Sequence, residues 1–382
     1  MKLLVVSLLL LCVCLRSPAQ TTPAEKLDLH ETRYYILKTD LATDDAREAG
    51  LRMTKMAEEY TRRTRDFSGD IHTRFPFYLV RDDQLYLKLG GVEGSAGLFN
   101  GQALVVHVPD GHVDARVWHV LQHEGFHQFA DAVIGGQRPV WVNEGIAEYF
   151  GEALFSGDGF TTGIIPQWRL KRMRDEFRQR KFLSIDQMMQ LSLDEWNSNL
   201  SIRNYDQGWS MVHFLIHGDG GRYRDAFGRF MIDLGHNRAW KDAWKDNFGD
   251  TTGFEDRWRE YWTRLPDNPS ASLYTKNTVA TLTSFLARAT AQKQTFANYE
   301  AFADAARAGK PSIAKAQWLP PSLLGSAIAD ADEMAKRGAK WTLSESKPSP
   351  KLICELKSGK RFVGQFKLRG DEIQFVSVDE PR

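Results

Sequence analysis

The strongest constraint on this chain is a pair of histidines inside a helical segment. Residues 117–150 read VWHVLQHEGFHQFADAVIGGQRPVWVNEGIAEYF, in which His123, Glu124 and His127 form the pattern H-E-x-x-H. Two histidines four residues apart lie one turn apart on one helix face, so both imidazoles can reach a single metal ion. Glu124 would lie beside that ion, where a carboxylate can accept a proton from water instead of binding the metal. The segment therefore predicts a metal-binding helix.

The limits of this helix follow from its apolar periodicity and its flanking turns. Apolar residues recur at roughly helical spacing over residues 113–133. Residues 109–111 read Pro-Asp-Gly and predict a turn before the helix, and the glycine pair at 135–136 stands where a helix C-terminus favours glycine. Gly125 should cost about 1 kcal/mol relative to alanine. A destabilising glycine inside the motif indicates close packing or a nearby backbone.

A third metal ligand is expected from the segment that follows. A catalytic zinc site takes three protein ligands and leaves one position open. The second helical run, residues 140–153, carries Glu144 and Glu148 on one face. An antiparallel helix pair would bring Glu144 over the histidines. Glu148, one turn further on, could then accept the remaining N–H of a ligand histidine and fix its tautomer.

Other histidines are alternatives to this arrangement. His119 precedes His123 by four residues, but positions eight apart on a straight helix, such as His119 and His127, lie about 12 Å apart along the axis. That separation is too long for both to bind one ion. His213 and His217 are also four residues apart, without an accompanying carboxylate motif. We expect them to be core or groove histidines, and the alternative is that one approaches the metal as an outer hydrogen-bond donor.

The two helical segments resemble a known group of enzymes. H-E-G-F-H followed by N-E-G-I-A-E-Y-F is similar to the gluzincin metallopeptidases, which include thermolysin and the large zinc aminopeptidases, and in particular to secreted bacterial peptidase-MA-like proteins. The resemblance implies one zinc ion per chain. The roles that it implies are zinc ligands for His123, His127 and Glu144, the general base for Glu124, and an outer carboxylate for Glu148. Sixteen residues separate His127 from Glu144, slightly fewer than in the best-known members.

The resemblance extends more weakly over residues 30–265. It implies that the strand ahead of the motif helix, residues 103–108, pairs with an extended peptide by strand addition; an ordinary sheet strand is the alternative. Residues 97–101 occupy the place of a glycine-rich aminopeptidase motif but contain no glutamate, which favours an endopeptidase or another zinc hydrolase. Tyr205 lies sixty-one residues after Glu144. Its position is similar to that of a tyrosine in the zinc aminopeptidases that donates a hydrogen bond to the oxyanion formed during hydrolysis. The alternative for Tyr205 is a buried structural role.

The predicted fold is α+β, with a zincin-like catalytic unit. Strand patterns at residues 31–39, 74–80 and 103–108, with a helix at 44–67, predict a small N-terminal sheet before the zinc helices. The remainder is expected to be mostly helical, with a short C-terminal β-meander. The expected divisions are a signal peptide at 1–19, the N-terminal part of the catalytic unit at 20–110, its helical part at 111–265, a helical region at 266–345, a linker at 346–350 and a β appendage at 351–382.

Two further polar segments each have a structural interpretation and a possible functional one. Residues 169–181 carry seven basic side chains and two acidic ones, and we expect a charged helix face, with a site for acidic substrate as the alternative. Residues 369–371 read Arg-Gly-Asp and are predicted to be a hairpin turn of the β appendage. The appendage is too small to be very stable alone. It is expected to dock on the body or to bind an envelope partner.

The first residues predict export. Lys2, an apolar run over residues 3–15 and small residues at 17–19 read as a secretory signal, so the protein is expected to be secreted or periplasmic. Cys12 and Cys14 would be removed with it, since the residues before them do not favour lipid attachment. Of the three cysteines, Cys354 would remain, without an intramolecular disulfide partner.

Charge and composition limit the other functions. The chain carries 50 basic and 49 acidic side chains, which gives no indication of nucleic-acid binding, and no later segment predicts a membrane span. The sequence therefore predicts a secreted zinc metallopeptidase with peptide or protein substrates. The alternatives are a zinc-retaining envelope binding or scaffold protein and a hydrolase of a nonpeptide amide. A structural zinc site should have a fourth protein ligand, and none is evident near the motif.

Overall fold

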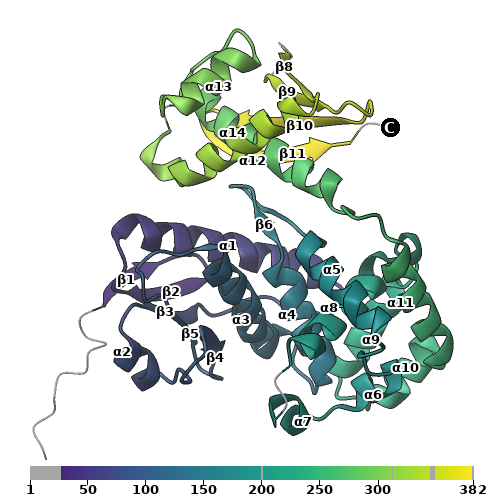
Figure 1. The fold of residues 1–382 in the computed structure, drawn as a ribbon. Helices are drawn as coiled ribbons and strands as arrows, with labels where there is room; N and C mark the ends of the chain where they lie inside the picture. The colour runs from purple at the N-terminus through teal and green to yellow at the C-terminus, as the bar shows by residue number, and fades with distance from the viewer. Residues whose placement is uncertain (1–26, 199–200, 312, 345–348, 381–382) are drawn as a thin grey trace, which may run out of the picture.

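The structure is a computed structural model that describes residues 27–198, 201–311, 313–344 and 349–380. The predicted signal peptide, with Cys12 and Cys14, lies outside the described residues, as does most of the predicted linker. Figure 1 shows a larger lower part, which runs to α11, and a smaller upper part, which runs from α12 to β11. Within the ranges described, no helix is long and apolar enough to cross a membrane.

A sheet begins the lower part, as predicted, and it has five strands where three were expected. Its order is β1-β2-β3-β5-β4, in which β2, β3 and β5 are parallel and the two edge strands are antiparallel to their neighbours. The elements of this region are β1 (Asp28–Glu31), β2 (Tyr35–Thr39), α1 (Thr43–Thr64), β3 (Phe75–Val80), α2 (Asp83–Lys88), β4 (Gly97–Phe99) and β5 (Leu104–His107).

The position of β5 corrects one expectation. The resemblance implied that residues 103–108 pair with an extended peptide, but β5 is hydrogen-bonded to β3 on one side and β4 on the other. The chain turns back because Asn100 Oδ1 accepts hydrogen bonds from the Gln102 and Ala103 amides, so residues 97–99 cover the free side of β5. The edge strand on this side of the sheet is therefore β4. The prediction of strand addition on β5 is wrong, and residues 103–108 contain an ordinary sheet strand, which was the alternative.

The predicted helix pair consists of α3 (Ala115–Val133) and α4 (Val140–Gly151), which lie side by side. The α3 helix begins two residues later than predicted, because Asp114 Oδ1 accepts hydrogen bonds from the Arg116 and Val117 amides. After α3, Gly135 and Gly136 take φ angles of 63° and 70°. These left-handed conformations favour glycine and allow the short connection to α4.

The cause of the mid-helix Gly125 is close packing with α1. A Cβ atom at Gly125 would lie 2.5 Å from Met53 Cε and 3.1 Å from the Tyr60 hydroxyl. Met53, Met56 and Tyr60 of α1 are fully buried. Gly125 therefore lets the motif helix pack closely against α1.

Helices complete the lower part around an aromatic core. This core contains the fully buried side chains Trp141, Trp196, Trp209, Trp258 and Trp262. The remaining elements are β6 (Leu154–Phe155), β7 (Phe160–Thr161), α5 (Gln167–Arg178), α6 (Ile185–Gln190), α7 (Leu193–Ser198), α8 (Ile202–His217), the 3-10 turn η2 (Gly218–Gly220), α9 (Arg224–Gly235), α10 (Trp240–Phe248) and α11 (Thr252–Arg264).

Helix α8 crosses α4 at very short range. A Cβ atom at Gly145 would lie 2.5 Å from the Gly208 carbonyl oxygen, and one at Gly208 would lie 3.1 Å from the Trp141 carbonyl oxygen. A glycine on each helix thus lets the two backbones approach each other. The crossing places Tyr205 and Asp206, at the start of α8, beside the polar face of α4.

The upper part has one core shared by helices and sheet. A four-stranded antiparallel sheet in the order β11-β10-β9-β8 packs on α12, where a Cβ atom at Gly364 would overlap Thr283 Oγ1. The strand β8 falls in the range expected to be helical, and residues 369–371 form the predicted turn between β10 and β11. The elements are α12 (Ala271–Ala291), α13 (Tyr299–Arg307), η3 (Lys315–Gln317), α14 (Pro321–Lys336), β8 (Lys340–Ser344), β9 (Lys351–Glu355), β10 (Arg361–Arg369) and β11 (Glu372–Asp379).

The two parts touch through the β6–β7 hairpin, which extends from the lower part to α12 (Figure 1). Asp158 of this hairpin forms an ion pair of 2.8 Å with Arg288 of α12, whose side chain is 7% exposed. The Ser270 hydroxyl, just before α12, accepts a hydrogen bond from the Ile165 amide. The predicted α+β class, with an N-terminal sheet, a helical middle and a C-terminal meander, is confirmed.

Candidate metal centre

Three predicted ligands meet where α3 faces α4. His123 Nε2 lies 3.1 Å from His127 Nε2 and 3.2 Å from Glu144 Oε2, and His127 Nε2 lies 3.4 Å from the same carboxylate oxygen. The three side chains are nearly buried. In the part of the chain that the structure describes, no fourth His, Cys, Asp or Glu joins this group. The arrangement could hold a metal ion with an open side.

Glu148 lies behind the first histidine. Its Oε1 is 3.1 Å from His123 Nδ1 and 3.4 Å from His119 Nε2. Burial alone would lower the pKa of His123, but hydrogen bonds to Glu144 and Glu148 hold that pKa well above its ordinary value. Since His123 contacts one carboxylate through each ring nitrogen, its ring orientation is fixed from both sides.

His119 belongs to a different group from the expected triangle. Together with His123 and Glu148 it forms a second cluster that could hold a metal ion. In this cluster His123 would have to bind through Nδ1. Glu148 is also an ion-pair partner of a buried arginine, so its carboxylate already has a cationic partner.

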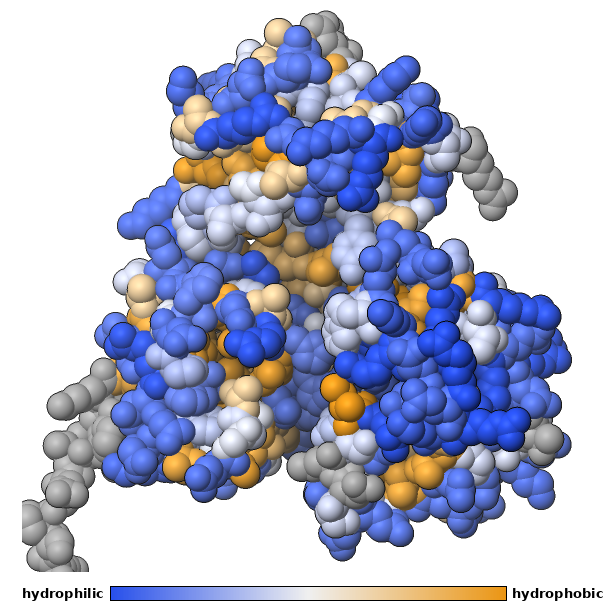
Figure 2. Space-filling view, in the orientation of Figure 1, coloured by the Kyte–Doolittle hydropathy of each residue, from blue (hydrophilic) through white to orange (hydrophobic). Residues whose placement is uncertain are grey.

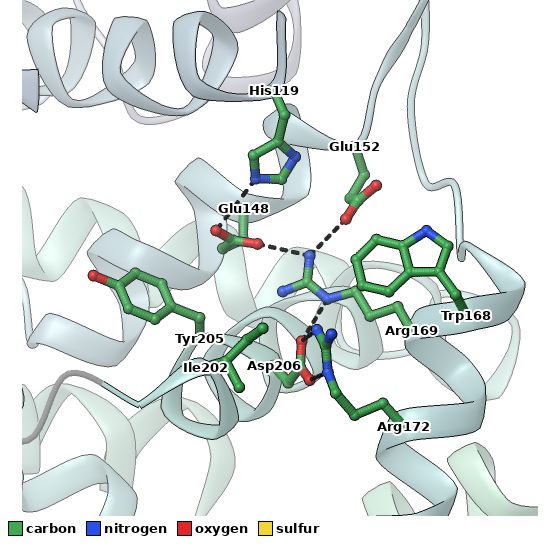
Figure 3. A pocket seen from close by; sticks show the side chains of 9 residues that line it. All are labelled: His119, Glu148, Glu152, Trp168, Arg169, Arg172, Ile202, Tyr205 and Asp206. Atoms are coloured by element: carbon green, nitrogen blue, oxygen red, sulfur yellow. Dashed lines mark hydrogen bonds and ion pairs between the residues drawn. The ribbon is translucent and has the colours of Figure 1, made fainter. Parts of the chain in front are cut away.

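That arginine, Arg169 of α5, corrects the expectation of a charged solvent-facing helix. Its side chain is 2% exposed, and it forms ion pairs of 2.6 Å with Glu148, 2.7 Å with Glu152 and 2.8 Å with Asp206 (Figure 3). Burial raises the pKa of the Glu148 carboxyl, but Arg169, His119 and His123 hold it well below its ordinary value. Arg172 pairs with the same Asp206 at 2.5 Å. The basic segment is therefore partly internal, and it ties α4 to α8.

Glu124 lies at the sheet edge instead of in the ligand triangle. Its Oε2 accepts a hydrogen bond of 2.9 Å from the Phe99 amide of β4. Phe99 falls within residues 97–101, the segment that occupies the place of the aminopeptidase motif but lacks its glutamate. The amide fixes one carboxylate oxygen of Glu124 and leaves the other outside this hydrogen bond.

His127 is oriented by Asn143, which precedes Glu144 in the chain. Asn143 Nδ2 lies 3.0 Å from His127 Nδ1, and Asn143 Oδ1 accepts a hydrogen bond from Arg138 Nε at 3.2 Å. Binding of a metal through His127 Nε2 would place the proton on Nδ1. Asn143 would then have to present its carbonyl oxygen to that N–H.

Tyr205 lies beside the same site. Its ring centroid is 6.2 Å from that of His123 and 5.1 Å from that of Trp196. Burial and then the charge of Glu144 raise the pKa of the Tyr205 phenol to about 12. The phenol therefore stays protonated near neutral pH and can act as a hydrogen-bond donor.

A cavity of about 420 Å³ opens next to these groups, and Figure 3 shows the side chains that line it, with Tyr205 on one wall and Arg169 on the other. It shares His119, Glu152 and Trp168 with a second, more apolar cavity of about 710 Å³ that reaches Asn277 of α12. Figure 2 shows the surface hollowed between the upper and lower parts, with apolar side chains at the back. The two cavities therefore lie next to each other.

His213 lies in the core and His217 is half-buried beside it, in keeping with the expected core or groove positions. His213 is 2% exposed, and its Nε2 lies 3.2 Å from the Gly163 carbonyl oxygen. Burial holds the pKa of His213 well below its ordinary value. His217 Nε2 lies 3.0 Å from the Tyr149 hydroxyl. Neither histidine forms an ion pair with a carboxylate among the residues described.

Several groups at this site were not anticipated from the sequence. Asn143 stands beside a predicted ligand and could have been suspected from that adjacency alone. Arg169 and Asp206 lie in segments that had been noticed for other reasons, and their pairing joins α5 to α8 over a distance of 37 residues in the chain. The Phe99 amide is a backbone group, for which the sequence carries no signal.

Residues 119–234 match the model of a protein family of unknown function, DUF1570. The matched segment contains both candidate metal clusters but not the N-terminal sheet or the upper part. No curated protein matches the chain. The chain therefore contains a DUF1570-like segment in which histidine and glutamate side chains could hold a metal ion.

Proposed function

We propose that the protein is a zinc-dependent metallopeptidase whose ligands are His123, His127 and Glu144. The observation that carries the proposal is the size of the ligand triangle, with sides of 3.1, 3.2 and 3.4 Å. A tetrahedral zinc ion with bonds of about 2.0–2.1 Å requires neighbouring ligand atoms to lie about 3.3–3.4 Å apart. Two imidazole nitrogens and one carboxylate oxygen also suit zinc better than calcium or magnesium, which prefer oxygen ligands.

The proposed chemistry is amide hydrolysis. When bound, zinc would act as a Lewis acid that lowers the pKa of the attacking water and polarises the substrate carbonyl. Glu124, held by the Phe99 amide, would accept the proton of that water and return it to the leaving amine. Tyr205 would donate a hydrogen bond to the developing oxyanion, since its raised pKa keeps the phenol protonated.

A peptide substrate is supported by the free edge of β4. Its outer side is unpaired among the described strands, and its Phe99 amide already contacts Glu124. An extended peptide added to this edge would run directly past the proposed general base. Secretion of the protein, expected from residues 1–19, is part of the proposal, because a peptidase of this kind would then act outside the cytoplasm.

The test is cleavage of a mixed peptide library by zinc-loaded protein and by Glu124→Gln. The side-chain carbonyl oxygen that this substitution provides can still accept the Phe99 hydrogen bond, so the variant should keep its zinc while turnover falls by about 10²–10⁴-fold. The matched control is Glu93→Gln, which changes an exposed glutamate of the same lower part and should leave turnover unchanged. Equal cleavage by wild type and Glu124→Gln would contradict the proposal.

A second candidate is a zinc-retaining binding or scaffold protein. A structural zinc site should be closed by a fourth protein ligand, and the described residues supply three. Stoichiometric zinc without cleavage of any peptide would favour this second function, or hydrolysis of a nonpeptide amide.

A further inference from the structure

A separate cavity lies behind α4, on the side away from the metal centre. We call it the rear cavity; its volume is about 320 Å³, within the range of small-molecule sites. Ile146, Tyr149 and Phe150 contribute from α4, and these positions lie on the opposite helix face from Glu144. Ile216 and Phe227, from α8 and α9, complete a largely apolar floor. An aliphatic or aromatic group would be desolvated there.

The rim of the rear cavity is cationic. Arg62 and Arg63, at the end of α1, share the single carboxylate of Glu59. Arg65 lies 3.7 Å from Asp66. Two carboxylates therefore face three guanidinium groups at this end of α1.

Arg224, on the other side of the rim, increases this excess. Its Nε and Nη2 donate hydrogen bonds to the Ile216 carbonyl oxygen at 3.3 and 3.2 Å. Among the described carboxylates, none forms an ion pair with Arg224. The rim thus carries an excess of two positive charges, on a chain whose formal net charge is +1.

The positive charge of the arginine rim also acts on His217, which lies next to the cavity wall. Burial and then the charges of Arg63 and Arg224 lower the pKa of His217 to about 4. His217 contacts the hydroxyl of Tyr149, which lines the cavity. A bound anion would therefore be attracted by at least these two guanidinium groups.

We propose that the rear cavity is a binding site for an amphiphilic anion, an aliphatic carboxylate of medium chain length. The apolar floor would bury the chain, and the arginine rim would bind the carboxylate head by charge-assisted hydrogen bonds. A small inorganic anion would leave the floor unfilled, and a cationic amphiphile would be repelled by the rim. The proposal does not depend on the metal centre or on catalysis.

The ligand test is calorimetric titration of the full zinc-loaded chain with decanoate. We expect saturable binding of one decanoate per chain, about tenfold tighter than binding of octanoate, because two more methylene groups are buried. Acetate and decyltrimethylammonium should not bind. Absence of saturable decanoate binding, or equal binding of decyltrimethylammonium, would overturn the proposal.

Gly228→Leu tests the location without removing any contact. Gly228 lines the rear cavity on α9, and a Cβ atom there would meet no other atom within 4 Å, so a leucine side chain can enter the cavity. The variant should retain its fold, since leucine has a higher helix propensity than glycine. It should lose decanoate binding. The matched control is Gly325→Leu in α14, where a Cβ atom also has open space. Unchanged decanoate binding in Gly228→Leu would overturn the proposal.

The charge of the rim is tested on the same helix. Arg224→Gln should weaken decanoate binding at least about tenfold, because it removes a charge-assisted contact. Arg229→Gln is its control, since Arg229 is an exposed α9 residue outside the rear cavity that contacts Asn247. Equal weakening by the two variants would show a general charge effect and contradict the assigned site.

Discussion

The two histidine pairs of this protein have the same spacing but opposite surroundings. His123 and His127 of α3 have ring centroids 4.8 Å apart, and His213 and His217 of α8 have ring centroids 4.6 Å apart. Carboxylates of α4 contact the first pair and hold the pKa of His123 well above its ordinary value. The second pair lies among aromatic rings, and burial holds the pKa of His213 well below its ordinary value.

This difference shows that spacing alone does not define a metal centre. Two imidazoles one turn apart are compatible with a metal site or with a packed core. The α3 pair becomes a candidate metal site because α4 supplies Glu144 on one side and Glu148 on the other. The α8 pair has hydrogen bonds to neutral partners instead. The two pairs should therefore respond differently to substitution and to pH.

The direct comparison is His123→Ala against His213→Ala. The first removes a proposed ligand and should weaken zinc binding by more than the roughly 10–100-fold expected for loss of an outer partner, while the fold is retained. The second should leave zinc affinity unchanged and lower the free energy of unfolding by about 1–3 kcal/mol. Competitive zinc titration and urea unfolding of both variants measure the two effects. If His213→Ala lost zinc while keeping the stability of the wild type, His213 would be a metal ligand, and the assigned roles of the two pairs would be wrong.

Removal of Arg169 should disturb the carboxylate support of the first pair. Arg169→Leu leaves Glu148, Glu152 and Asp206 without their buried cation, and we expect a loss of about 3–5 kcal/mol in the free energy of unfolding. Arg178→Leu, on the same helix, changes a side chain that is 75% exposed and should cost about 0.5 kcal/mol or less. Urea unfolding curves distinguish the two. Similar small losses in both variants would mean that Arg169 does not hold the carboxylates.

The second pair predicts a pH dependence of stability. An unfolded histidine titrates at a pKa of about 6.5, whereas folded His217 has a pKa of about 4. Below pH 6.5 the unfolded chain therefore takes up a proton that the folded chain does not, and stability falls as the pH falls towards 4. The expected loss from His217 is about 3 kcal/mol by pH 4.

The measurement is urea unfolding of zinc-free wild type and His217→Gln at pH 7.5 and pH 4.5. The wild type should lose more stability on acidification than the variant, because glutamine does not titrate. His213, which is buried with a lowered pKa, acts in the same direction and remains in both proteins. An identical pH dependence of the two proteins would show that His217 is not held neutral in the fold.

The smallest effect concerns Glu148. Glu148→Gln keeps a hydrogen-bond acceptor for His123 Nδ1 but removes the charge, so zinc affinity should fall by about 10–100-fold with zinc still bound at saturation. Glu195→Gln, at an exposed position of α7, is the control. Zinc affinity equal to that of wild type would show that the charge of Glu148 does not tune the metal ligand.

The sequence predicted those features that depend on local pattern. Apolar periodicity and turn residues located α3, α4 and the N-terminal strands, and spacing selected His123, His127 and Glu144. The edge position of β4 could not be predicted, because it depends on a turn at Asn100 that places a three-residue strand alongside β5 in the sheet. Burial of Arg169 depends on partners that come from α4 and α8, and a basic segment carries no signal for such long-range pairing.

The close contacts between helices could not be predicted from the sequence either. Gly125 was recognised as unfavourable in a helix, but the side chains that it accommodates come from α1, some seventy residues earlier. Gly145 and Gly208 gave no signal in isolation, since each is explained only by the backbone of the other helix. The strand β8 was not predicted for a similar reason. It pairs with β9 across a segment whose composition is typical of a linker.

The most direct test of the central claim is zinc-edge anomalous diffraction from a crystal of the zinc-loaded protein. The account predicts one zinc peak per chain, bound by His123 Nε2, His127 Nε2 and a Glu144 oxygen at about 2.0–2.2 Å, and none at His213 and His217. A peak bound by His119, His123 and Glu148 instead, or no peak between α3 and α4 after zinc loading, would contradict it.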